Sequence, residues 1–377
     1  MGDNDENINK AREKIRILIV PLDWGLGHAT RCIPIIYALI HAGAYVFLAG
    51  ENNTEAILKK EFPLLPFLPL KGYNIRYSKN KKSFLLKLLS QLPAIKNTIQ
   101  HEQKWLKKVV KEHKIDAVIS DNRFGLYHAV IPTVYITHQL HIETGSTLLN
   151  KFAQQMHYHY INRFTECWVP DAAGEKNLAG KLSHPTQPPA VTIKYIGILS
   201  RFKKQEPEIK TKLLVILSGP EPQRSIFEKI ILDQLKKIEA PVIFVRGLPA
   251  QKEILAVQKN IEMYNHMPAN ELSMHIQQAA MVLARAGYST VMDLATLQQK
   301  AILVPTPGQA EQEYLAVCLK QQQLFYTCNQ DNFNLKKALT EAEEFYKKEI
   351  VPPETLNEDF IINWLKEIEK RRSVLNF

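Results

Sequence analysis

Cysteine is scarce in this sequence, and no long apolar run is uninterrupted. The four cysteines among 377 residues lack the paired spacing of a zinc site, which is typical of free thiols in a reducing compartment. Two uncharged runs, 32–50 and 124–142, contain prolines and histidines, whereas a membrane-spanning helix needs about 20 continuous apolar residues. Residues 1–14 are polar and charged, so we expect no secretory signal peptide. These absences favour a cytoplasmic protein without a transmembrane helix.

The Asp-x-Asp motif, with which one class of sugar transferases binds a metal and a nucleotide, is absent from the body of the chain. It occurs once, at Asp3-Asn4-Asp5, within an acidic and polar tail over residues 1–13 that we expect to be disordered. We therefore predict no metal site and no cofactor.

Acidic residues are rare in one segment, which carries the whole charge imbalance. The net charge is +10; residues 71–114 contain twelve Lys and Arg but two acids, and the rest of the chain holds 36 of each sign. Within residues 71–96, leucines repeat at helical spacing beside lysines. Either a solvated helix packed on the core or a basic amphipathic patch on the anionic inner face of a membrane explains this pattern. The segment lacks spaced aromatic residues that stack on bases, so we expect no nucleic-acid partner.

The length of the chain indicates two domains of about 150–200 residues each. A buried strand over residues 15–20, a glycine loop, a helix and a second strand begin a doubly wound α/β domain. A charged linker over residues 200–211 follows, and the strand–turn–helix pattern then begins again. We thus expect an N-terminal Rossmann-like domain over 14–199, a C-terminal one over 212–350, and a final helix within 351–377 that packs back on the first domain.

Polar residues at the ends of three expected strands indicate one crevice in the first domain. In the glycine loop, Gly25 and Gly27 precede His28, and Thr30 replaces the third glycine of the dinucleotide fingerprint. Further polar residues follow the expected strands over 115–120 and 133–137. Because the carboxyl ends of parallel strands meet at one sheet edge, we expect these side chains to share one ligand-binding cleft. The residues after the two later strands are Asp121, Asn122, His138 and Gln139.

Residues 281–317 read as strand, glycine turn, helix, strand, turn and helix. Gly287 permits the sharp turn, and Ser289 and Thr290 open the helix. The free backbone N–H groups at such a helix N-terminus bind phosphate, and Asp293 lies near enough to hold a pair of ribose hydroxyls. A βαβ unit without a ligand explains the same topology, so the pattern alone leaves both interpretations open.

Two doubly wound halves, the glycine loop and the stretch RAGYSTVMDLATLQQKAILVPTPGQAEQ at 285–312 together resemble one group of enzymes. The chain is similar to GT-B glycosyltransferases, close to the MurG-like family (glycosyltransferase family 28), which moves N-acetylglucosamine from UDP onto a lipid-linked acceptor. The resemblance covers roughly residues 15–325 and is most specific at 283–312. It implies two Rossmann-like domains that face an interdomain cleft, with a UDP-sugar as the donor substrate.

By position, the resemblance places the donor site mainly on the second domain and the acceptor in the crevice of the first. The turn over residues 285–290 would lie against the diphosphate. Asp293 stands where the family has a ribose-binding glutamate, Gln312 matches a glutamine that holds sugar hydroxyls, and Glu313 stands where a second glutamine is common. The donor-site residues that the resemblance implies are Arg201, Ser218, Gly219, Arg285, Ala286, Gly287, Ser289, Thr290, Asp293, Gln312 and Glu313.

Sugar transfer from a nucleotide diphosphate requires a base for the acceptor hydroxyl and neutralisation of the leaving diphosphate. Helix N-termini and Arg285 are expected to neutralise that charge without a metal. His28 and His138 are the expected catalytic residues because imidazole titrates near neutral pH, and we prefer His28 as the base. By analogy with the family, we expect inversion at the anomeric carbon. The sequence does not identify the acceptor.

Two other functions stay open. A UDP-sugar epimerase or hydrolase on the same fold would use the same donor site without a sugar acceptor. A non-catalytic nucleotide-sugar-binding subunit would need Asp293 but neither His28 nor His138.

Overall fold

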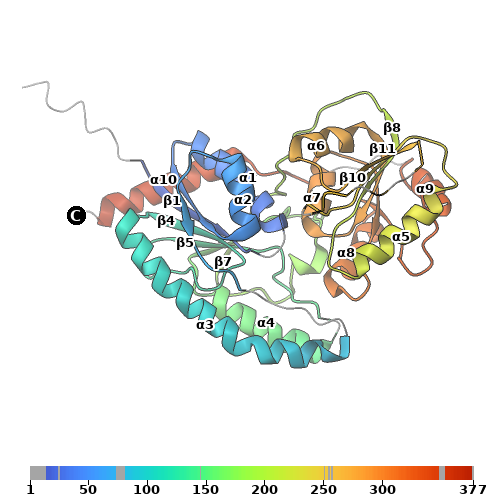
Figure 1. The fold of residues 1–377 in the computed structure, drawn as a ribbon. Helices are drawn as coiled ribbons and strands as arrows, with labels where there is room; N and C mark the ends of the chain where they lie inside the picture. Colours follow the sequence, from blue (N-terminus) through green and yellow to red (C-terminus); the bar gives the residue numbers. More distant parts are fainter. Residues whose placement is uncertain are drawn as a thin grey trace, which may run out of the picture.

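The computed structural model describes residues 14–23, 26–73, 81–144, 146–249, 251–253, 255, 258–347 and 353–375, and the backbone alone for residues 26, 81–92, 147–148 and 375. Two parallel β-sheets, each covered by helices, form two Rossmann-like domains that lie side by side (Figure 1). The first domain is built on strands β1–β7 and the second on strands β8–β13. The expected GT-B-type α/β architecture is confirmed.

The sheet of the first domain has the strand order β3-β2-β1-β4-β5-β6-β7. Its order reverses between β1 and β4, which pair in parallel from Ile17 opposite Ala117 to Pro21 opposite Asp121. Ligands of doubly wound sheets bind at the carboxyl ends of strands beside such a reversal. The strands are β1 (Arg16–Pro21), β2 (Tyr45–Gly50), β3 (Phe67–Pro69), β4 (Ala117–Asp121), β5 (Thr133–Ile136), β6 (Glu166–Val169) and β7 (Thr192–Tyr195), and the helices are α1 (Leu26–His41), α2 (Asn52–Glu61), α3 (Lys81–His113), α4 (Thr147–Ile161) and the 3-10 turn η1 (Gly180–Leu182).

The sheet of the second domain has the order β10-β9-β8-β11-β12-β13, and it reverses between β8 and β11. The loops after these two strands therefore form the second ligand-binding edge of the molecule. The strands are β8 (Thr211–Ile216), β9 (Val242–Val245), β10 (Ile261–Tyr264), β11 (Ala279–Arg285), β12 (Ala301–Val304) and β13 (Tyr326–Thr327), and the helices are α5 (Gln223–Leu235), α6 (Ala269–Gln278), α7 (Tyr288–Thr296), α8 (Ala310–Gln321), α9 (Leu335–Phe345) and α10 (Glu358–Leu375).

The central strands are apolar on both faces because helices cover both sides of each sheet. In β1, the residues from Ile17 to Val20 are all fully buried. Ile17 and Ile19 pack in the cluster that includes α1, whereas Leu18 and Val20 pack with α3 on the opposite face. This arrangement fixes the exits of β1 and β4, from which the polar residues of the cleft project.

Helix α10 follows the second domain in sequence but packs on the first (Figure 1). Its Phe360 and Trp364 rings lie edge-on to Trp168 of β6, with centroids 4.9 and 5.0 Å away. Arg372 of α10 lies 3.4 Å from the Asp116 carboxylate, just before β4. The chain therefore crosses between the two domains twice.

The structure contains a strand that was not expected, and several segments fall outside the described residues. Strand β10 was not expected because its four residues, IEMY, are too few to show a repeating apolar pattern. The expected tail over 1–13 and residues 74–80 of the expected basic segment 71–96 lie outside the described residues, as do the side chains of 81–92. In the part of the chain that the structure describes, no helix is both long and apolar enough to cross a membrane.

Candidate active site

The carboxyl ends of β1, β4 and β5 in the first domain face helices α7 and α8 of the second. The N-terminal turns of α1 and α7 lie in close contact, and a Cβ atom on Gly27 would lie 2.6 Å from the Ser289 hydroxyl. A glycine at this position leaves room for the Ser289 side chain. Two helix N-termini, each with unpaired N–H groups and a partial positive charge, therefore meet at the domain interface.

On the first domain, His28 and Arg31 of α1 both bond to the Asp121 carboxylate at the end of β4. His28 Nδ1 lies 3.0 Å from Asp121 Oδ1, Arg31 Nε donates to Asp121 Oδ2 at 2.6 Å, and an Arg31 terminal nitrogen donates to Oδ1. Burial alone would raise the pKa of Asp121, but Arg31 and His28 outweigh it and hold that pKa well below its ordinary range. The carboxylate thus stays ionised and accepts hydrogen bonds from both neighbours.

His138, which follows β5, connects this cluster to the second domain. Its Nε2 lies 2.9 Å from Oε1 of Glu311 on α8, and its Nδ1 lies 3.3 Å from Nη1 of Arg31. Its ring stacks on Tyr288 of α7 with centroids 4.1 Å apart and planes 5° from parallel. The Tyr288 hydroxyl in turn donates to the backbone oxygen of Pro170 at 2.7 Å. His138 is therefore an interdomain contact.

These contacts decide the tautomers of the two histidines. Arginine can only donate, so Nδ1 of His138 accepts from Arg31 and its Nε2–H donates to Glu311, which leaves His138 no free nitrogen. For His28, the Asp121 carboxylate accepts from Nδ1–H, and Nε2 keeps its lone pair. Burial lowers the pKa of His28 despite the opposing effect of Asp121, and Arg31 adds to the lowering. Neutral His28 can take a proton at Nε2, whereas His138 as placed here cannot act as a base.

Sequence reasoning missed two members of this cluster, Arg31 and Glu311. Arg31 is three residues after His28 and therefore lies on the same face of α1, which is a signal that the sequence offered. Glu311 directly precedes Gln312 at the start of an expected helix. Burial would raise the pKa of Glu311, but the hydrogen bond from His138 and the charge of Arg31 lower it, so its carboxylate is ionised.

The expected acceptor-side residues have mixed placements. Gly25 lies outside the described residues. The Thr30 hydroxyl donates to the backbone oxygen of Gly27 at 3.1 Å, which makes it part of the helix start. Asn122 adopts a left-handed conformation with φ of 54° just after β4, and the backbone N–H of Gln139 donates to Thr137 Oγ1 at 3.1 Å. The side chains of Asn122 and Gln139 are half-buried at the carboxyl edge of the sheet.

On the second domain, the start of α7 presents an open surface. A Cβ atom on Gly287 would meet nothing within 4 Å, and Ser289 and Thr290 are half-buried. Asp293, one turn further, accepts from the Ser200 hydroxyl at 2.6 Å, and burial raises its pKa to about 6 despite Ser200 and Arg201. Nε of Arg201 is buried without a hydrogen-bond partner among the described residues. The residues expected to bind diphosphate and ribose thus gather beside the link between the domains.

The expected role of Arg285 is wrong for the side chain as the structure places it. The guanidinium is 1% exposed, and it donates to the backbone oxygens of Pro305 and Gln223 at 3.3 and 3.0 Å and to Gln330 Oε1 at 2.7 Å. It also lies 4.3 Å from the Phe227 ring centroid, and burial lowers its pKa to about 10. Arg285 therefore ties the loops after β12 and β13 to α5 and does not present its charge to a diphosphate.

The other expected donor residues divide into exposed and inward-bonded ones. Ser218 and Gly219 are exposed in the loop after β8, and Ala286 is fully buried, so only its backbone can face a ligand. Gln312 accepts from the Thr306 backbone N–H at 2.9 Å. Glu313 accepts from the Gly308 backbone N–H at 2.7 Å. These two side chains hold the turn between β12 and α8, which corrects the expectation that both face the sugar directly.

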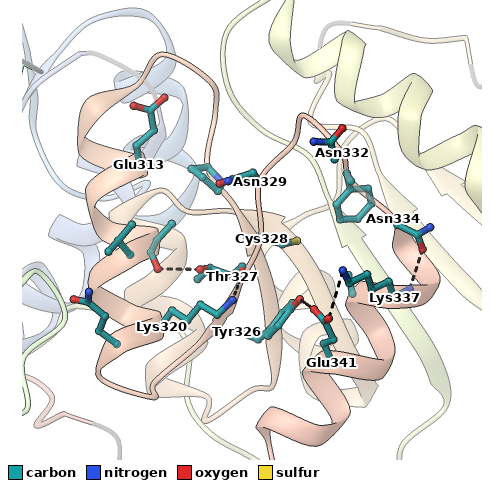
Figure 2. A pocket seen from close by; sticks show the side chains of 16 residues that line it. Glu313, Lys320, Tyr326, Thr327, Cys328, Asn329, Asn332, Asn334, Lys337 and Glu341 are labelled. Carbon is teal, nitrogen blue, oxygen red and sulfur yellow. Dashed lines mark hydrogen bonds and ion pairs between the residues drawn. The ribbon is translucent and has the colours of Figure 1, made fainter.

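A separate hollow of about 700 Å³ lies between α8, β13 and α9, and Glu313 is at its rim (Figure 2). Its polar lining is largely bonded to itself. Lys320 donates to the backbone oxygen of Thr327 at 3.2 Å, Lys337 lies 3.8 Å from Glu341, and Tyr326 donates to the same carboxylate. Because none of the His28 cluster reaches it, this hollow is distinct from the candidate active site.

Comparison with known proteins agrees with the fold and the second domain. Residues 215–360 match the sequence profile of the Glycosyltransferase family 28 C-terminal domain. An uncharacterized glycosyltransferase of Methanosarcina acetivorans is 20% identical over 330 residues, which cover 82% of this chain and 84% of that protein.

Among solved structures, the glycotransferase of kitacinnamycin superposes with a TM-score of 0.64 at 12% identity, covering 95% of each chain. Arabidopsis thaliana UGT89C1 complexed with UDP-L-rhamnose gives a TM-score of 0.62 at 12% identity, covering 96% of this chain and 94% of that one. At this identity the structural likeness establishes the GT-B fold. The match of residues 215–360 to the glycosyltransferase family 28 C-terminal domain and the similarity to the Methanosarcina protein support a glycosyltransferase activity.

Proposed function

We propose that this protein is a MurG-like, inverting and metal-independent transferase that moves N-acetylglucosamine from UDP-N-acetylglucosamine to a lipid-linked acceptor. The observation that carries the proposal is the His28–Asp121 pair, which lies at the start of α1, where that helix meets the N-terminus of α7. The match to the family 28 C-terminal domain and the sequence resemblance at 283–312 support the choice of donor.

His28 is the general base of this reaction. As the acceptor hydroxyl attacks the anomeric carbon, its proton passes to Nε2 of His28, and Asp121 stabilises the imidazolium through Nδ1–H. The new bond joins the acceptor oxygen to the anomeric carbon, and the bond from that carbon to the diphosphate breaks. Attack from the face opposite the leaving group inverts the configuration. The occupied nitrogens of His138 support the choice of His28 over it.

The leaving diphosphate is neutralised by the converging N-termini of α1 and α7. Free backbone N–H groups at both ends provide donors and partial positive charge, and Gly287 leaves room for the phosphate oxygens. Arg201, whose Nε is unpartnered among the described residues, is the cation beside this region, and Asp293 holds the ribose hydroxyls. This assignment replaces Arg285 as the source of positive charge.

Three experiments test the transferase proposal. We expect UDP and UDP-N-acetylglucosamine to raise the melting temperature, because a ligand at 100 times its Kd stabilises by about 2.7 kcal/mol. No response to any uridine nucleotide would contradict the proposed donor. NMR of the product should show inversion at the anomeric carbon, and a retained configuration would overturn the mechanism. UDP-N-acetylglucosamine should stay intact without an acceptor; rapid hydrolysis or epimerisation would favour those activities instead.

The proposed acceptor places the protein at the cytoplasmic face of a membrane. The described part of α3 and its end support this location with six exposed lysines and few acids. They are Lys96, Lys104, Lys107, Lys108, Lys111 and Lys114. We expect binding to anionic vesicles at low salt that weakens in 0.5 M salt, since the Debye length falls with ionic strength to about 3 Å at 1 M. Equal recovery with anionic and neutral vesicles would exclude this surface as a membrane contact.

A further inference from the structure

We propose that Glu311, on the second domain, is a positioning residue that completes the general base of the first domain when the domains adopt the arrangement seen here. The inference rests on the proposed function in naming His28 as the base. It gives Glu311 a role in addition to any contact with the donor, because the carboxylate makes the protonation of His28 depend on the position of the second domain.

An unbroken chain of polar contacts joins Glu311 to His28. Glu311 Oε1 lies 2.9 Å from Nε2 of His138, whose Nδ1 lies 3.3 Å from Arg31, and Arg31 and His28 share the Asp121 carboxylate. This series of contacts starts on α8 of the second domain and ends on α1 of the first. If α8 moves away, His138 loses the acceptor that holds its proton on Nε2, and Nδ1 is no longer fixed as the acceptor for Arg31.

The charges of the cluster give the same conclusion independently. Without Glu311, a protonated His28 would add a second cation to Arg31 while Asp121 supplies one negative charge. Such an unbalanced pair of cations is costly where solvent is excluded, and a further carboxylate removes the imbalance. Glu311 is that carboxylate, and it is ionised and close enough to interact with both His28 and Arg31. The positive charge of protonated His28 is therefore balanced only when the second domain is in place.

The groups around His28 come from every neighbouring element. Asp121 on β4, Arg31 on its own helix, His138 after β5 and Glu311 on α8 all act on it, and Tyr288 of α7 stacks on His138. Among these, Asp121 and Glu311 are the negative charges, and Glu311 alone of the two lies on the other domain. Its side chain is 35% exposed, so the substitution of Glu311 by Gln leaves no buried cavity.

The test compares Glu311→Gln with Tyr314→Phe, a control on the same helix. The Tyr314 hydroxyl accepts from the Lys181 backbone N–H at 2.8 Å, which is an interdomain contact outside the chain of contacts described above. In the unliganded full-length protein, the His28 titration is followed by NMR of its ring Cε1–H. We expect Glu311→Gln to lower the midpoint by about half a pH unit or more, because a negative charge near an imidazole favours its protonated form. Tyr314→Phe should leave the midpoint in place.

Kinetics give the second readout. His28 must be unprotonated to act, so kcat/KM rises with pH through its pKa, and Glu311→Gln should move this acid limb to lower pH while kcat falls. An unchanged limb with a raised KM for the donor would make Glu311 a sugar contact only and overturn the inference. The same shift in Tyr314→Phe would also overturn it. If Glu311→Gln does not fold, Glu311→Ala answers the same question.

The two proposals fail in different ways. If the wild-type protein transfers no sugar from any uridine nucleotide sugar, the proposed function fails, but the His28 titration still reports whether Glu311 acts on it. If the wild-type protein is active and the His28 midpoint is the same in Glu311→Gln, the inference alone fails.

Discussion

The two sides of the domain interface, the first-domain wall and the second-domain wall, differ in how many of their polar side chains are already hydrogen-bonded within the protein. On the first-domain wall, His28, Arg31 and Asp121 bond to one another in a nearly buried cluster. On the second-domain wall, Ser289 and Thr290 are half-buried and make no side-chain hydrogen bond to another described residue. The first wall has reactive groups that are held in position before a substrate binds, whereas the second wall keeps the hydroxyls of Ser289 and Thr290 available for a ligand. Changes to the two walls should therefore affect different quantities.

The largest effect is expected for His28→Ala, which removes the base from the preassembled wall. We expect kcat to fall by about 10²–10⁴-fold, the usual contribution of general base catalysis. Initial rates at saturating donor, together with melting temperatures, measure the effect. His141→Ala is a matched control, since His141 is half-buried nearby and outside the cluster. A His28→Ala protein with wild-type kcat would show that this wall is structural.

Arg31→Met tests whether the same wall depends on its buried ion pair. The change leaves the Asp121 carboxylate fully buried without its guanidinium partner, so we expect a loss of about 3–5 kcal/mol in the free energy of unfolding at pH 7. Urea unfolding measures it. The double variant Arg31→Met, Asp121→Asn removes the uncompensated charge and should lose less; an equal loss would mean that packing and not charge is responsible.

Asp293 makes the stability of the second wall depend on pH. Its pKa is raised from 3.8 to about 6, so between these values the folded state holds a proton that the unfolded state has lost. Stability therefore falls as pH rises from about 4 to 6, by at most about 3 kcal/mol and by less where solvent screens the carboxylate. Asp293→Asn should remove this slope in urea unfolding at pH 4, 5, 6 and 7. A slope that persists in Asp293→Asn would assign it to another group.

The smallest effect is expected where the two walls touch, at Gly27 and Ser289. A Cβ atom at Gly27 would lie 2.6 Å from the Ser289 hydroxyl and 3.3 Å from its Cβ, so Gly27→Ala must shift Ser289 slightly. Alanine is also the better helix former by about 1 kcal/mol, which offsets part of this cost. In the Ser289→Gly background the clash is absent, and Gly27→Ala should become more favourable by about 0.5–1.5 kcal/mol. Additive melting shifts across the four proteins would show that the walls do not touch in solution.

The parts of this arrangement that follow from chain order were predictable from sequence. His28 follows β1 and Asp121 ends β4, and strand ends beside a reversal of strand order must meet at one edge. The glycine turn before α7 was equally visible. In each case the argument needed only the order of the elements and not the direction of a side chain.

Side-chain direction and contacts between domains were not predictable in this way. Arg285 lies at the expected turn, but its side chain points under the loops after β12 and β13, because strand residues alternate between faces. Glu311 and His138 are 173 residues apart in sequence, and they meet only because of how the two domains are placed relative to each other. Its neighbour Gln312 matched the family pattern and Glu313 stood where a second glutamine is common, but both side chains turn back onto their own loop.

The return of α10 to the first domain has a consequence for how this enzyme can be recombined. In topological terms the second domain is an insert, since the chain leaves the first domain after β7 and re-enters it where Ile198 pairs with Thr355. A chimaera that exchanges everything after residue 200 would therefore take Trp364 away from Trp168 and expose the first core. An exchange of the second domain that preserves the cores of both domains needs two junctions. Helix α10 must then come from the same parent protein as strands β1–β7.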